Sequence, residues 1–148
     1  MLQRDILKGP EAMSRSITFN FSTVGETGAG LGRSANGHSI IADRPAGTAG
    51  GSGLGFNGAE LLAASLGGCF WNDLHHAAQE TAPDFRVDQL DARVDLAGDP
   101  PRVVRARISA KLSGADEETL LRLFEAACDG STIANSLRPA FQISFQRL

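Results

Sequence analysis

The chain has 148 residues, 42% of them hydrophobic, which predicts a single domain with one core that needs neither disulfides nor a structural metal. Its formal net charge is −3 and its 14 basic residues are scattered, which excludes the basic patch typical of proteins that bind nucleic acid or an anionic membrane surface. Charged residues near the start interrupt the apolar segment that a signal peptide needs. The sequence therefore predicts a cytoplasmic protein whose two cysteines are reduced thiols.

The first third of the chain predicts short strands separated by glycine-rich segments. Residues 1–15 are expected to form an N-terminal arm, and residues 16–24 alternate with the period of a half-buried strand. The apolar face of this strand is predicted to consist of Ile17, Phe19 and Phe21. Residues 25–37 are expected to form a mobile loop or loose hairpin that contains Arg33, and a short strand should follow over residues 38–42.

The most apolar run of the chain, residues 61–71, predicts a core helix. Because this run is apolar on every side, the helix should be enclosed by protein on all its faces. Asn57 is expected to cap the helix and Glu60 to complete a capping box, and the helix should end near Glu80. The apolar run is shorter than the roughly 20 residues of a membrane span, so no membrane partner is expected.

Two long strands, residues 87–97 and 102–112, are then expected to pair as an antiparallel meander with one wet face. Their inward positions are predicted to be Leu90, Ala92, Val94, Leu96, Val104, Ala106, Ile108, Ala110 and Leu112. A second helix is predicted over residues 116–130, a short helix over residues 132–137, and a last strand from residue 141 to 145. This order of elements differs from the alternating series of a doubly wound sheet.

Two patterns around the first helix bear on cofactors. Residues 53–58 spell GxGxxG, but a dinucleotide site needs a strand that runs straight into the glycines, and here a long loop precedes them. Cys69, Asp73 and His76 share one helix face at a spacing that can present ligands to a metal. One helix face supplies too few ligands for a closed site. We therefore expect neither a cofactor nor a metal.

The sequence ELLAASLGGC at residues 60–69, its glycine-rich approach and STIANSLR at residues 131–138 resemble the OsmC family, which includes osmotically inducible and organic hydroperoxide resistance proteins. The resemblance covers about residues 30–145. It implies a single domain, residues 1–148, with an α+β fold in which antiparallel curved sheets surround a long buried central helix. It also implies an intertwined homodimer and a thiol-dependent peroxidase that reduces organic hydroperoxides in oxidative-stress defence.

The resemblance assigns roles to four residues. Cys69 matches the reactive cysteine, and Glu60 matches the glutamate that orients an activating arginine. Arg33 stands in the glycine-rich loop where the family keeps its arginine, and Arg44 is a competitor. On one helix, nine residues place Glu60 about 13.5 Å along the axis from Cys69 and on the opposite face, so a reaching arginine or the partner subunit must close the gap.

The family's resolving cysteine falls on Ser131, which has no thiol. Regeneration of Cys69 would then depend on an external thiol reductant, or on Cys128, about one helical turn before Ser131. The alternative is a non-peroxidatic OsmC-like protein that binds a small apolar ligand at the dimer interface. In that case Cys69 could be a buried structural cysteine, as free cysteines often are.

Overall fold

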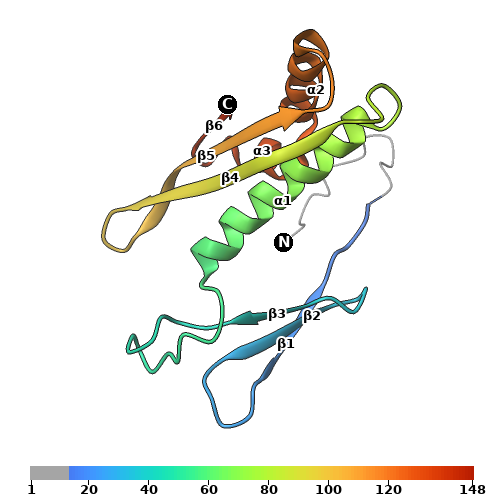
Figure 1. Cartoon of the computed structure of the whole chain (residues 1–148). Coiled ribbons are helices and arrows are strands. Elements are labelled where there is room, and N and C mark those ends of the chain that lie inside the picture. The colour runs from blue at the N-terminus through green and yellow to red at the C-terminus, as the bar shows by residue number, and fades with distance from the viewer. Residues whose placement is uncertain (1–13) are drawn as a thin grey trace, which may run out of the picture. The chain divides into compact units, whose positions relative to one another are not determined.

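The computed structural model describes residues 14–148, which form two compact units that divide after Phe56 (Figure 1). The predicted arm, residues 1–15, lies almost wholly outside the described residues. Within residues 14–148, no helix combines the length and the hydropathy that crossing a membrane requires.

The first unit contains an antiparallel sheet in the order β1 (Phe19–Thr23), β2 (Gly30–Ser34) and β3 (Ser39–Ala42). The predicted loop over residues 25–37 is therefore wrong in part, because β2 lies inside it. Gly32 explains the difference: it pairs with Phe21, whose ring lies where a side chain on residue 32 would stand, with Cε1 2.6 Å from an ideal Cβ. The glycines that suggest a loop here allow the close approach of an aromatic ring.

The predicted burial of one face of β1 is also wrong. All five residues of β1 are exposed, and Ile17 and Phe21 have 75% and 56% of their surface accessible. The described part of the first unit contains three short strands and no helix that could cover them. The alternation correctly indicates a strand, but its apolar face stays open within this unit.

The second unit, Asn57–Leu148, combines three helices with a sheet in the order β4-β5-β6. Its elements are α1 (Gly58–Ala78), β4 (Arg86–Ala97), β5 (Arg102–Ser113), α2 (Glu117–Gly130), α3 (Thr132–Leu137) and β6 (Gln142–Arg147). The antiparallel pairing of β4 with β5 is confirmed, whereas β6 pairs with β5 in parallel. The expectation of purely antiparallel sheets is thus wrong, because α2 and α3 form a crossover that returns the chain to the start of β5.

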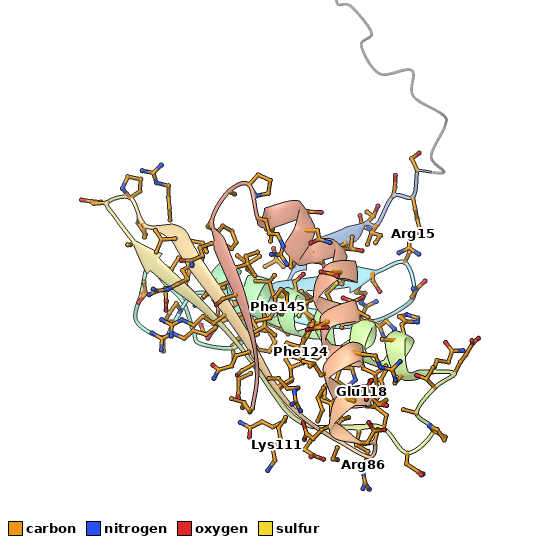
Figure 2. All side chains as sticks on the ribbon, turned by 90° about the horizontal axis from the view of Figure 1, so that it is seen from above. Arg15, Arg86, Lys111, Glu118, Phe124 and Phe145 are labelled. Carbon is orange, nitrogen blue, oxygen red and sulfur yellow. The ribbon has the colours of Figure 1, made fainter. Side chains whose placement is uncertain are left out.

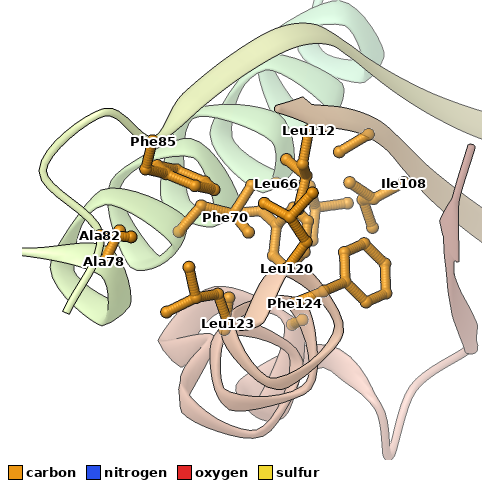
Figure 3. Close-up of a cluster of buried hydrophobic side chains, with 14 of the residues drawn as sticks. Leu66, Phe70, Ala78, Ala82, Phe85, Ile108, Leu112, Leu120, Leu123 and Phe124 are labelled. Atoms are coloured by element: carbon orange, nitrogen blue, oxygen red, sulfur yellow. The ribbon is translucent and has the colours of Figure 1, made fainter. Parts of the chain in front are cut away.

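The core of the second unit centres on Phe70 of α1, which is fully buried. The Phe70 ring packs edge-on against Phe124 of α2, with ring centroids 5.5 Å apart (Figure 3). Its centroid lies 4.8 Å from that of the Phe145 ring on β6. Most of the predicted inward positions of β4 and β5 belong to this core or pack against it. Leu96 and Val104 are exceptions and are exposed, because they lie near the β4–β5 turn, beyond the segment of β5 that pairs with β6.

Helix α1 is not enclosed on all its faces within one chain, and its complete enclosure by a partner subunit stays a prediction. Its buried residues are Leu66, Gly67, Phe70, Leu74 and Ala78. The opposite face exposes Ser65, Gly68 and Trp71, and 42% of the Trp71 surface is accessible. Strands β4 and β5 and helices α2 and α3 pack on α1, as does β6 through Phe145, and together they leave this face uncovered.

Two adjacent glycines of α1 provide a test of this packing. A Cβ on Gly67 would lie 3.0 Å from Ala92 Cβ and 3.3 Å from Leu90 Cδ2, whereas a Cβ on Gly68 would meet nothing within 4 Å. We expect Gly67→Leu to push α1 away from β4 and to lower the free energy of unfolding by about 2 kcal/mol. Gly68→Ala, the control, should raise it by about 0.5–1 kcal/mol through helix propensity. Urea unfolding measures both, and an unchanged Gly67→Leu midpoint would contradict the close approach.

Candidate functional site

Cys69 lies at the contact between α1 and the junction of α2 with α3, and it is half-buried rather than sealed in the core. Its thiol donates a hydrogen bond to Asp73 Oδ2 over 3.5 Å. The Ser131 hydroxyl donates to Cys69 Sγ over 3.8 Å. The sulfur therefore has a carboxylate acceptor on one side and a hydroxyl donor on the other.

Ser131 reaches this position from the residue that ends α2 and begins α3. A serine at a helix N-cap usually accepts a hydrogen bond from a backbone amide of the first turn. The Ser131 side chain makes no such capping bond, is 1% exposed, and donates to the sulfur instead. The residue aligned with the resolving cysteine by resemblance is thus in direct contact with Cys69.

Glu60 is engaged at the start of α1, where the predicted capping box is confirmed. Asn57 Oδ1 accepts from the Glu60 amide at 3.0 Å, and Glu60 Oε2 accepts from the Asn57 amide at 2.8 Å. Since α1 is unbroken from Gly58 to Ala78, the helix itself separates Glu60 from Cys69. The pairing of Glu60 with an activating arginine stays a prediction.

The two candidate arginines both belong to the first unit. Arg33 is exposed on β2, paired with Asn20 and Ser39 in the neighbouring strands. Arg44 follows β3, and its Nη2 donates to the Gly28 carbonyl at 3.1 Å and to Asp43 Oδ1 at 3.3 Å. Arg44 therefore has partners within its own unit, whereas Arg33 is exposed to solvent. Which arginine serves Cys69 stays a prediction.

Asp43 organises the glycine-rich approach to α1. Its buried carboxylate accepts hydrogen bonds from the backbone amides of Leu54, Arg44 and Ser52 at 3.0, 2.8 and 3.1 Å. These bonds, led by that from Leu54 and helped by the Arg44 charge, outweigh desolvation and lower the pKa of Asp43 below its usual value.

Cys128, the alternative resolving thiol, lines a cavity of about 480 Å³ together with Arg138. Phe124 and Phe145, which are labelled in Figure 2, line the same cavity. Burial, and then the neighbouring Asp129 charge, raise the pKa of the Cys128 thiol to about 11. Since the thiolate is the form that attacks a sulfenic acid, this raised pKa makes Cys128 a poorer resolving group than an ordinary cysteine. Both cysteines are free.

The spacing of Cys69, Asp73 and His76 brings the first two together. Among residues 14–148, no group of three or more His, Cys, Asp or Glu side chains is placed to hold a metal ion. Sequence reasoning treated Asp73 only as a possible metal ligand. Its i, i+4 spacing from Cys69 was the available signal for a direct contact with the thiol.

A family model described as OsmC-like protein matches residues 50–146, which is more than half of the chain. The chain belongs to the OsmC-like family. The matched range contains Cys69 and Ser131 and every element of the second unit apart from the last residue of β6. No curated protein matches this OsmC-like chain.

Solved structures resemble the chain over nearly its full length. An OsmC-like protein of unknown function from Vibrio cholerae matches with a TM-score of 0.73 and 14% identity, over 91% of this chain and 100% of that one. An organic hydroperoxide resistance protein OsmC from Legionella pneumophila gives 0.67 and 18%, over 93% and 98%. The organic hydroperoxide resistance protein OhrB of Bacillus subtilis gives 0.65 and 19%, over 90% and 98%. At these identities the likeness shows the fold, and the expected α+β class is confirmed.

Proposed function

We propose that this OsmC-like protein is a thiol peroxidase that reduces organic hydroperoxides in cytoplasmic oxidative-stress defence, with Cys69 as its nucleophile. The observation that carries the proposal is the half-buried Cys69 thiol held between a carboxylate and a hydroxyl. A structural core cysteine needs no polar partners, since it packs as a small hydrophobe. Family membership and the names of two of the similar structures support the same chemistry.

The reaction requires a thiolate that attacks one peroxide oxygen and a group that stabilises the departing alkoxide. Ser131 donates to the sulfur and would stabilise the thiolate. An arginine, Arg33 or Arg44, would supply positive charge for both the thiolate and the alkoxide, and Glu60 would orient it through a bidentate pair.

Regeneration of Cys69 would use an external thiol. Oxidised Cys69 becomes a sulfenic acid, which condenses with a thiol to give a disulfide. The nearest hydroxyl, that of Ser131, cannot form this bond, and Cys128 holds its proton at neutral pH. A small thiol or a reduced protein thiol would therefore complete the cycle.

We also propose that the protein acts as a homodimer. The uncovered face of α1, which includes Trp71, and the apolar side chains of β1 are surfaces that a second chain would bury. A dimer would also let groups of the partner subunit approach Cys69, which Glu60 on the same helix is too far away to reach directly. Sedimentation equilibrium at micromolar protein is expected to give twice the chain mass, and a monomer would contradict this part of the proposal.

Intact-mass spectrometry after one equivalent of cumene hydroperoxide tests the peroxidase activity. The wild-type chain and Cys128→Ala should each gain one oxygen and trap dimedone, because Cys69 forms a sulfenic acid. Cys69→Ala should show neither change. An unchanged wild-type mass would contradict the proposal and leave the binding of a small apolar ligand as the better account of this site.

A further inference from the structure

Asp73 is the polar group at the site to which the proposed peroxidase function gives no role. We propose that Asp73 is a catalytic residue that takes the proton of the Cys69 thiol and returns it to the alkoxide released from the hydroperoxide. This inference rests on the proposed function. It names a proton path built from this chain's own residues and separate from the arginine.

The geometry for the first transfer is in place. Asp73 follows Cys69 by four residues on the unbroken helix α1, so the two side chains share one face. The thiol already donates to Asp73 Oδ2 at 3.5 Å, within the distance expected for a bond to sulfur. Both residues are partly exposed, so an entering hydroperoxide could contact the sulfur and the carboxylate together.

Ser131 makes the arrangement directional. Its hydroxyl donates to the sulfur, while Asp73 accepts from the sulfur. The thiol proton therefore points to Asp73, and the sulfur lone pairs receive the serine hydroxyl. A carboxylate is a weaker base than a thiolate, so the transfer would be completed only as the sulfur attacks the peroxide.

The proposed step balances in protons and electrons. The Cys69 thiol gives its proton to the Asp73 carboxylate, and the sulfur electron pair attacks the terminal oxygen of the hydroperoxide. The S–O bond forms as the O–O bond breaks, and the alkoxide leaves with the electron pair of that bond. Asp73 then protonates the alkoxide, which gives an alcohol, a cysteine sulfenic acid and a regenerated carboxylate. Sulfur is oxidised by two electrons and the peroxide is reduced by two.

A purely electrostatic role for Asp73 predicts a different result. A negative charge beside the sulfur disfavours the thiolate, so removing that charge should speed every reaction of Cys69. In either reaction the Cys69 thiol can lose its proton to water, so what sets the relay apart is the return of a proton by Asp73, which matters only when the leaving group needs one. Alkylation by iodoacetamide releases iodide, which needs none, and cumene hydroperoxide releases an alkoxide, which does.

The test compares Asp73→Asn with the parent in a Cys128→Ala background, so that one thiol is followed. Asparagine keeps the size and the acceptor oxygen of aspartate but cannot take a proton. We expect the rate of Cys69 oxidation by cumene hydroperoxide to fall about 100-fold, while alkylation by iodoacetamide is unchanged or faster. Asp91→Asn, which removes the same charge from an exposed position on β4, should leave both rates unchanged.

Asp73→Ala provides a second variant, and it should show the same split between the two reactions. Oxidation of Asp73→Asn at the parent rate or faster would overturn the relay, and so would an equal loss of oxidation and alkylation. A parent protein that cumene hydroperoxide fails to oxidise would overturn the proposed function and the relay together. The two failures are thus distinguishable in one set of measurements.

Discussion

The contact between α1 and the α2–α3 junction is the constraint on which the candidate site depends. The buried Phe70 ring holds α1 in this contact because it packs against both α2 and β6. The absence of a side chain at Gly67 lets the same helix approach β4. With the helix held on two sides, Cys69 faces the residue that joins α2 to α3, and that residue is Ser131.

This constraint gives Cys69 its mixed environment. The face of α1 turned to the core carries only apolar side chains and glycine, whereas Cys69 and Asp73 lie at its margin and keep partial exposure. Trp71 lies on the uncovered face. One face of this apolar helix therefore packs in the core of its own chain, and the proposed dimer would bury the other face.

Local signals predicted much of the fold. The capping box at Asn57 and Glu60 and the short helix over residues 132–137 depend on residues close in sequence, and both are confirmed. Strand β2 was not predicted because the reason for a glycine at residue 32 is the Phe21 ring on the neighbouring strand β1, which a local pattern does not reveal. The parallel pairing of β6 was missed because a long crossover, rather than strand periodicity, determines direction.

The site was predictable only in part. Resemblance placed Ser131 at the resolving position, but neither composition nor spacing shows that its hydroxyl contacts the sulfur. Asp73 was visible as an i+4 neighbour of Cys69, yet whether two side chains on one helix face meet depends on their rotamers. The raised pKa of Cys128 follows from its burial and from the nearby Asp129, which a helical pattern alone does not determine.

The central claim is that Cys69 is a peroxide-reactive thiol whose resolving position is occupied by a serine. The most direct test is to put a thiol there, in Ser131→Cys with Cys128→Ala, and to add one equivalent of cumene hydroperoxide. The account predicts that a disulfide between residues 69 and 131 forms within the chain, seen by intact mass and peptide mapping, in place of the dimedone-reactive sulfenic acid. Two free thiols after peroxide treatment, or a sulfenic acid that persists beside the new cysteine, would contradict it.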